Sequence, residues 1–370
     1  MSRWKTIHSF ARQHYIGIIL TTLIILGFAI RLYHLDWQCL TADERTTFEY
    51  VSNKTLPQLL VWALGSDYNP PLFYLLSKVS TIAFGEATRY ALRFPFMILG
   101  TLAIPLSYLL GKEIEGKWTG IFTAIFIAAS FPFIYYSQNA RAYMLVFVAF
   151  LAFTIYYVRV YRGDNSQKTI IIAAVLAALC LWSHFYSIIP ICIMSAFLIR
   201  EHFLELKKGI CVAILVCLPF AYYIPVVINH LLHFQGFVHS IYWLTPSEIA
   251  ITTPYELFGQ GWVVIAIAIG YTMFIYQDRL YAILFVTGIL TALTCIPTAL
   301  VTAMSARYAL IVSPLLFIVA IYPIVIFMRT RTLQQQMTIV AMVAYFIFIT
   351  NYGSMLSFTT FNICPYVGWL

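Results

Sequence analysis

Charged side chains are scarce in this sequence, where Asp, Glu, Lys and Arg together make up 10% of the 370 residues. An ordinary soluble chain has about 25%. Neither a P-loop nor a GxGxxG sequence occurs, and the seven cysteines form no CxxC pair and no Cys/His metal pattern. These absences argue against a soluble globular enzyme, a cytoplasmic nucleotide site, and a zinc or redox centre.

Hydrophobic residues make up 62% of the chain and are spread over its whole length. A single water-soluble core stops growing near ~250–300 residues, so lipid must be the solvent for much of this surface. The net charge is +8, but the basic residues lie in short breaks between apolar runs and do not gather on one face. We therefore expect membrane lipids as partners and no nucleic acid.

Long apolar runs predict the architecture. The runs long enough to cross a bilayer are, approximately, 15–33, 92–112, 118–137, 142–161, 169–185, 186–200, 210–229, 260–277, 281–302, 307–328 and 336–352. They predict an all-α, polytopic integral membrane protein with about eleven transmembrane helices. The apolar segment Leu72–Phe84 is too short to span, and we expect it to form a helix at the outer interface.

The distribution of Lys and Arg predicts the orientation. If the N-terminus is cytoplasmic, 14 of the 22 basic residues fall in the inner breaks, and every inner break holds at least one. Cytoplasmic loops carry such an excess of Lys and Arg. The pattern predicts a multi-pass protein of the cell membrane with its N-terminus in the cytoplasm.

Two breaks are long, and both fall on the outer side in this orientation. They occupy residues 33–91 and 231–259, and loops of this length are usually functional. We expect a transmembrane module at 1–230 that carries the catalytic outer loop 33–91. A second transmembrane region at 231–370 would carry the outer loop 231–259.

Several polar residues fall on the same outer side. Asp43 and Glu44 form a carboxylate pair, and the segment Asn69-Pro70-Pro71 is typical of a helix cap and start. Arg141 and Arg307 adjoin apolar runs without an adjacent acid in the sequence. Buried arginines need water, a partner or an anion, and the guanidinium fork suits phosphate. The alternative is that the acids are solvated and the arginines reach the interface.

The order of these features resembles the GT-C glycosyltransferases. The resemblance rests on Asp43-Glu44, Asn69-Pro70-Pro71-Leu72, the sequence YSQNARAY at 136–143, and Arg307-Tyr308. More narrowly, the chain is similar to the branch of protein-O-mannosyltransferases and lipid A aminoarabinose transferases. The resemblance covers about residues 1–200 and returns at Arg307. It implies a GT-C fold with a helical first outer loop.

The resemblance also implies an activity. It is the transfer of a sugar from a polyprenyl-phosphate carrier to a hydroxyl of a lipid, glycan or protein acceptor at the outer face, with inversion. Asp43 would be the general base, with Glu44 as a second catalytic residue. The substrate-binding residues implied are Asn69, Arg93, Asn139, Arg141, Tyr143, His184, Arg307 and Tyr308. One base is sufficient because a lipid phosphate leaves as a stable anion and needs cations rather than an acid.

Two positions depart from the family pattern. Asn139 stands where many relatives carry Glu, and Asn69 replaces the commoner His. Both changes weaken the case for a divalent metal, so we assign no metal ligand and no certain cofactor. The alternative function is a transporter or flippase of lipid-linked sugars, whose ionisable groups would lie near mid-membrane.

Overall fold

The computed structural model describes residues 2–65, 69–199, 245–276, 278–298 and 306–361, together with a few isolated residues between 200 and 244. No strand occurs in this part of the chain. The α-helices include α1 (Ser2–Leu32), α2 (Ala42–Asn53), α3 (Leu56–Gly65), α4 (Leu72–Phe84), α5 (Arg89–Glu115), α6 (Lys117–Ala129), α7 (Phe131–Ser137), α8 (Tyr143–Tyr161), α9 (Gln167–Ser183), α12 (Pro246–Phe258), α13 (Trp262–Ile275), α14 (Arg279–Thr298), α15 (Ser313–Met328) and α16 (Leu333–Phe361). Short 3₁₀ turns are η1 (Phe185–Ser187), η4 (Gly259–Gly261) and η5 (Ala306–Val312).

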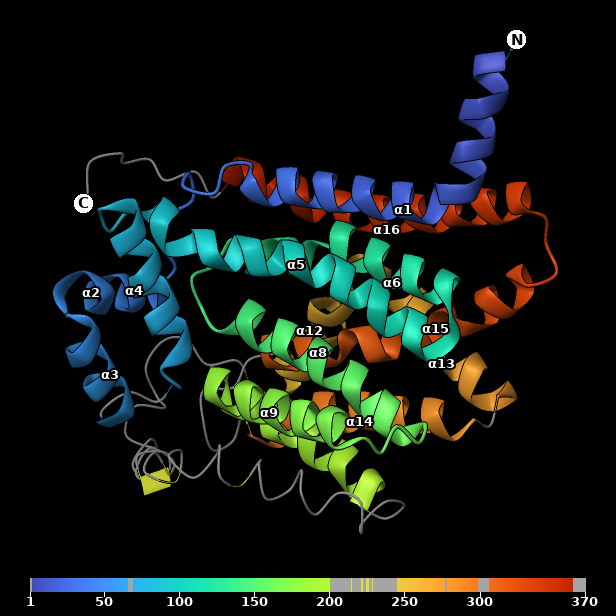
Figure 1. Ribbon diagram of the computed structural model, residues 1–370. Helices are drawn as coiled ribbons and strands as arrows, with labels where there is room; N and C mark the ends of the chain where they lie inside the picture. The colour runs from blue at the N-terminus through green and yellow to red at the C-terminus, as the bar shows by residue number, and fades with distance from the viewer. Residues whose placement is uncertain are drawn as a thin grey trace.

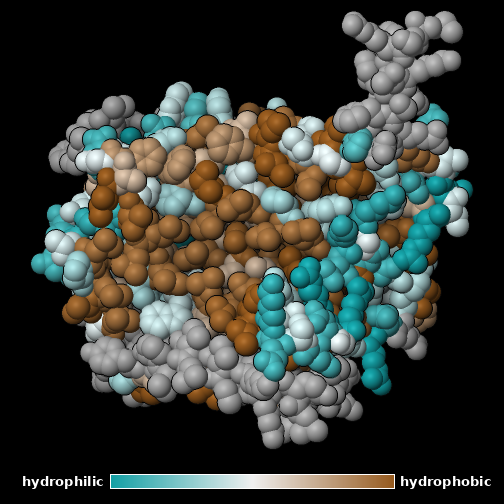
Figure 2. Space-filling view, in the orientation of Figure 1, coloured by the Kyte–Doolittle hydropathy of each residue, from teal (hydrophilic) through white to brown (hydrophobic). Residues whose placement is uncertain are grey.

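The long helices form a bundle with α5 and α6 at its centre. Helix α5 packs against α1, α6 and α8, while α15 and α16 also pack against α6. Helices α2, α3 and α4 stand together at one end of the bundle, on the left in Figure 1. The face in Figure 2 carries a broad apolar area with hydrophilic side chains toward both ends of the bundle. This is the surface expected of a protein whose solvent is a bilayer.

Small residues allow α5 and α6 to approach closely. A Cβ atom on Gly111 would lie 2.7 Å from the carbonyl oxygen of Thr119, and one on Gly120 would lie 2.5 Å from that of Tyr108. Gly116, with φ +103°, makes the turn between the two helices. Glycines at helix crossings are a common means of packing helices in membranes, where backbone contact replaces the hydrophobic effect.

The predicted membrane-spanning character is confirmed, but the count of eleven is not. Seven of the described helices are long and apolar enough to cross a membrane, and α6 with α7 makes an eighth if the pair is one span. The runs predicted at 169–185 and 186–200 form shorter apolar helices, Gln167–Ser183 and Phe185–Ile199. The run predicted at 210–229 lies outside the described residues.

The run predicted at 118–137 is broken rather than continuous. Its two helices, α6 and α7, are bent by 59° at Ser130. Arg31 of α1 is fully buried beside this break and donates hydrogen bonds to the carbonyl oxygens of Ile127 at 2.7 Å and Ala128 at 3.3 Å. These carbonyls belong to the last turn of α6, where helical partners run out. The arginine therefore satisfies the broken helix end from inside the bundle.

Two local expectations need correction. Residues 246–258, expected within the loop 231–259, form helix α12, because Thr245 and Glu248 close a capping box and Pro246 occupies the first turn. The rest of that loop, 231–244, lies outside the described residues. Helix α4 spans Leu72–Phe84 as predicted, but its N-cap is Pro71 and no side chain caps it, so Asn69 is not the cap.

Candidate functional site

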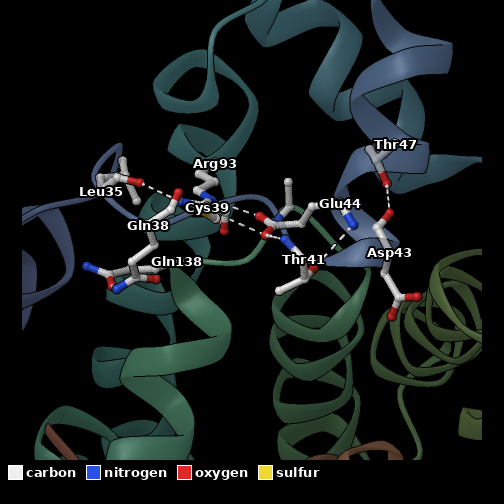
Figure 3. A network of polar contacts seen from close by, with 10 residues as sticks. Leu35, Gln38, Cys39, Thr41, Asp43, Glu44, Thr47, Arg93 and Gln138 are labelled. Atoms are coloured by element: carbon white, nitrogen blue, oxygen red, sulfur yellow. Dashed lines mark hydrogen bonds and ion pairs between the residues drawn. The ribbon is translucent and has the colours of Figure 1, made fainter. Parts of the chain in front are cut away.

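Helix α2 sets the positions of the two predicted catalytic acids. Thr41 is its N-cap and forms a capping box with Glu44, in which each side chain bonds the other residue's backbone N–H. Asp43 and Glu44 are consecutive, so they point about 100° apart around the helix. Figure 3 shows the result, with the carboxyl group of Asp43 directed away from the contacts of Glu44.

Glu44 is fully buried and makes a two-pronged ion pair with Arg93. The Nε and Nη2 atoms of Arg93 donate to Glu44 at 2.8 and 2.9 Å. The remaining N–H groups of Arg93 reach the carbonyl oxygens of Leu35, Gln38 and Cys39 at 3.0–3.1 Å (Figure 3). A guanidinium has five N–H donors, and here all five are used within the chain.

Glu44 also reaches the predicted YSQNARAY segment. Its Oε1 atom accepts a hydrogen bond from the backbone N–H of Ala140 at 2.9 Å. Gln138, two residues earlier, donates to the carbonyl oxygens of Arg31 and Tyr33 at 2.9 and 2.8 Å. The turn between α7 and α8 is thereby tied to both α1 and α2.

Asp43 is the accessible member of the acid pair. Its side chain is 41% exposed, and its Oδ2 atom accepts a hydrogen bond from Nη2 of Arg307 at 3.0 Å. The carboxyl group lies in the first turn of α2, where the helix dipole favours a negative charge. Asp43 therefore combines access to solvent with a fixed cationic neighbour.

Arg141 and Arg307 differ from Arg93 in keeping donors unused. Arg141 is buried against the ring of Phe73, and only its Nη1 atom has acceptors among the described residues, the Asp43 carbonyl at 3.4 Å and Thr47 Oγ1 at 3.2 Å. Arg307 uses Nη2 alone, and its Nε is buried with no partner in the described part of the chain. Two guanidinium groups with open donors thus flank Asp43.

Tyr143, His184 and Tyr308 form an aromatic cluster beside Arg307. The guanidinium carbon of Arg307 lies 5.3 Å from the ring centre of Tyr143 and 5.8 Å from that of Tyr308. The rings of His184 and Tyr308 have centres 4.7 Å apart. Burial, together with the positive charges of Arg141 and Arg307, lowers the pKa of His184 to about 3. The imidazole is therefore neutral at physiological pH.

The side chains of the two predicted asparagines lie outside the described side-chain hydrogen bonds of Asp43, Arg141 and Arg307. Asn139 is buried in the turn after α7, and its Oδ1 atom has no hydrogen-bond partner among the described residues. Asn69 is half-buried just before α4. The described residues include no group of three or more His, Cys, Asp or Glu side chains that could hold a metal ion.

The sequence assigned no role to Glu256, and it gave Tyr136 only as part of the motif YSQNARAY. Tyr136 donates from its hydroxyl group to Glu256 Oε2 at 2.8 Å, and both line a cavity of about 270 Å³ that also contacts Arg307. The available signal was that Glu256 is a lone acid next to the apolar run 260–277. The loop predicted at 231–259 gives Glu256 no fixed place.

Comparisons with known proteins agree with the predicted resemblance. The sequence model of the family "Dolichyl-phosphate-mannose-protein mannosyltransferase" matches residues 68–228. The search of curated proteins gave no match.

Solved structures of two oligosaccharyltransferase complexes and of ArnT are among those similar in fold. The oligosaccharyltransferase of Archaeoglobus fulgidus in complex with Zn and sulfate matches with a TM-score of 0.66 and 15% identity over 95% of this chain and 54% of that chain. The oligosaccharyltransferase AglB from Archaeoglobus fulgidus, in complex with an inhibitory peptide and a dolichol-phosphate, matches with a TM-score of 0.62 and 13% identity over 97% of this chain and 57% of that chain. ArnT from Cupriavidus metallidurans bound to undecaprenyl phosphate matches with a TM-score of 0.59 and 14% identity over 89% and 63%.

The fold class follows from these matches. This chain has the membrane-embedded, all-α fold of the GT-C glycosyltransferases, and the resemblance seen in the sequence is confirmed. The chain spans 54–63% of the length of the structures that it resembles.

Proposed function

We propose that this protein is an inverting glycosyltransferase that moves a sugar from a polyprenyl-phosphate carrier to an acceptor hydroxyl. The observation that carries the proposal is the pairing of one accessible carboxylate, Asp43, with two arginines that keep donors unused, Arg141 and Arg307. Asp43 comes from α2, Arg141 from the turn between α7 and α8, and Arg307 from the 3₁₀ turn η5. The relatives support the ligand class, because ArnT was solved with undecaprenyl phosphate and AglB with a dolichol-phosphate.

Asp43 is the general base in this proposal. Its carboxylate takes the proton of the acceptor hydroxyl as the acceptor oxygen forms a bond to the anomeric carbon. The bond between that carbon and the phosphate oxygen breaks, and the carrier leaves as a phosphate anion. Attack from the face opposite the leaving group inverts the anomeric carbon. Asp43 then releases its proton to water.

Arg141 and Arg307 bind the carrier phosphate. Charge-assisted hydrogen bonds to an anion that gains charge in the transition state lower the barrier, and more so where water is excluded. Arg307 holds Asp43 as well, so one guanidinium would connect the base to the leaving group. His184, kept neutral by burial and by both arginines, adds no third charge to this cluster.

Glu44 and Arg93 take a positioning role, which revises their expected place at the substrate. Arg93 has no N–H group left for a ligand, and Glu44 is fully buried. Together they hold the start of α2, the segment after α1, and the turn at Ala140 in one arrangement. Asp43 is placed by this framework.

We place the site on the outer face of the cell membrane, with the N-terminus in the cytoplasm. The opposite end of the bundle holds the ion pairs Arg159–Glu113 and Arg329–Glu115, which fits the predicted excess of basic residues on the inner side. Cys39, close to Asp43 in the sequence, is disulfide-bonded, and disulfides persist in oxidising compartments. The acceptor would be a lipid, a glycan or a protein on that side.

The test of this function is transfer by the purified protein in lipid nanodiscs. Undecaprenyl-phosphate mannose and undecaprenyl-phosphate glucose are supplied with host membranes as the source of acceptor, and release of undecaprenyl phosphate is measured. Release that depends on the protein and is lost in Asp43→Asn supports the proposal. No release above the protein-free control with either donor contradicts it.

A further inference from the structure

The cavity beside Arg307 lies away from the aromatic cluster of His184 and Tyr308. Its volume is about 270 Å³, and its walls include Pro132, Tyr136, Tyr255, Glu256 and Arg307. Pockets for drug-sized ligands occupy about 300–1,000 Å³, so this one suits a smaller group, of the size of a single sugar ring. Arg307 borders the cavity while its Nη2 atom bonds Asp43, so the cavity and the proposed base share one guanidinium.

Glu256 occupies an unfavourable position for a carboxylate. It lies in the last turn of α12, where the helix dipole disfavours a negative charge. The helical stretch Pro246–Ile275 around it is long and apolar enough to cross a membrane, where a charge is costly. Tyr136 gives it one hydrogen bond, to Oε2 at 2.8 Å. No described residue donates to Oε1. A half-buried carboxylate with an open acceptor atom thus lines the cavity.

The cavity walls match the two kinds of surface on a sugar ring. Carboxylate oxygens accept hydrogen bonds from sugar hydroxyls, and they accept only. Tyr136, Tyr255 and neighbouring aromatic residues also line the cavity, and the apolar surface of aromatic rings suits the C–H side of a sugar. The negative charge of Glu256 repels a phosphate, so the carrier phosphate is directed to the opposite side of Arg307, towards Arg141.

We infer that this cavity binds the sugar ring of the donor, with Glu256 accepting hydrogen bonds from its hydroxyl groups and Tyr136 orienting Glu256. The inference rests on the proposed glycosyl transfer and names the site of its sugar. It places the anomeric carbon of this sugar beside Arg307, at the edge of the Glu256 cavity from which the bond to the phosphate at Arg141 leaves. Asp43, bonded to the same Arg307, is then within reach of the acceptor hydroxyl that attacks this carbon.

The test compares binding of sugar-bearing and sugar-free carriers. Affinities of wild type, Glu256→Gln, Tyr136→Phe and Arg141→Ala are measured in nanodiscs for undecaprenyl-phosphate mannose, undecaprenyl-phosphate glucose and undecaprenyl phosphate. Glu49→Gln, a change at an exposed acid of α2, is the matched control. Thermal unfolding of each variant identifies any loss of folding.

The expected result is selective. Glu256→Gln weakens binding of the preferred hexose donor about tenfold or more, as expected for a lost hydrogen bond to a charged group. The affinity of the same variant for undecaprenyl phosphate stays within about twofold of wild type. Tyr136→Phe weakens binding of the same donor by a smaller factor, while Arg141→Ala weakens binding of all three ligands. Equal affinity of wild type for hexose donors and bare carrier, or an equal change for both in Glu256→Gln, overturns the inference alone. Absence of carrier binding and transfer in wild type would overturn the proposed function instead.

Discussion

The Nη2 atom of Arg307 lies 3.0 Å from Oδ2 of Asp43, although 264 residues separate the two in the sequence. The contact joins the start of α2 to the 3₁₀ turn η5 that precedes α15. It brings together an acidic and a basic side chain that lie far apart in the sequence. In the proposed mechanism, the same guanidinium restrains the general base and binds the leaving phosphate.

Arg141→Ala and Arg307→Ala should each weaken binding of undecaprenyl phosphate. A hydrogen bond to a charged group contributes about 1.5–3 kcal/mol, which corresponds to roughly 10- to 150-fold in affinity. Arg45→Ala, at an exposed position of α2, serves as the control and should bind as wild type does. An arginine whose removal leaves carrier affinity unchanged is an interface anchor and not a phosphate ligand.

Glu44→Ala and Arg93→Ala should destabilise the fold. Each change leaves the other partner as an uncompensated buried charge, which costs about 3–5 kcal/mol. The double variant should lose less stability than the two single variants lose together, because the two residues interact directly. Thermal unfolding in detergent measures this, with Glu49→Ala as the exposed control. Additive losses would show that the pair is not coupled.

Arg31→Met should destabilise the bundle at the break between α6 and α7. Methionine is similar to arginine in length but apolar, so the carbonyl groups of Ile127 and Ala128 lose their hydrogen-bond donor. A buried polar group without a partner costs about 1–3 kcal/mol. Ile30→Met, at a neighbouring exposed position, is the control for the substitution itself. Equal melting temperatures for both variants would contradict this role.

His184 should make stability depend on pH in the acidic range. Its pKa is about 3 in the folded protein and about 6.5 when exposed, so between these values the unfolded chain binds a proton that the folded chain does not. Stability from this group is fully present above pH 6.5 and falls as the pH drops towards 3. From pH 7.5 to pH 5.0 the loss is about 2 kcal/mol.

The matched variant is His184→Asn, whose side-chain oxygen can still accept the bond from the backbone N–H of Tyr186. It should lose less stability than wild type between pH 7.5 and 5.0, measured by thermal unfolding. His14→Asn, at an exposed position, should behave as wild type. A wild-type slope in His184→Asn would contradict the lowered pKa.

The sequence was sufficient for the fold class and for the residues that gather at one end of the bundle. Apolar runs report helices directly, and Asp43, Arg141, His184 and Arg307 adjoin runs that end on the same side. It did not separate the roles of Asp43 and Glu44, since adjacent acids look alike until the helix direction is known. The Thr41-x-x-Glu44 pattern was the available signal, because a capping box already commits Glu44 to the backbone.

Other features depend on tertiary contacts that no local pattern reports. Arg31 satisfies carbonyl groups 96 and 97 residues away, a contact that the sequence around it does not report. The sequence predicts a loop around Glu256 because Pro246, Pro254 and Gly259 interrupt the segment. Proline in the first turn and glycine after the end of a helix are also helix boundaries, and the structure uses Pro246 and Gly259 in that way.

Asp43→Asn provides the most direct test of the central claim that Asp43 is the general base. Transfer from undecaprenyl-phosphate mannose or glucose is measured in nanodiscs beside Glu49→Gln, which changes an exposed acid of the same helix. We predict normal folding and carrier binding in Asp43→Asn, with transfer reduced by at least ~10²-fold, the low end for loss of a general base. Transfer by Asp43→Asn at the rate of Glu49→Gln would contradict the assignment of Asp43 as the base.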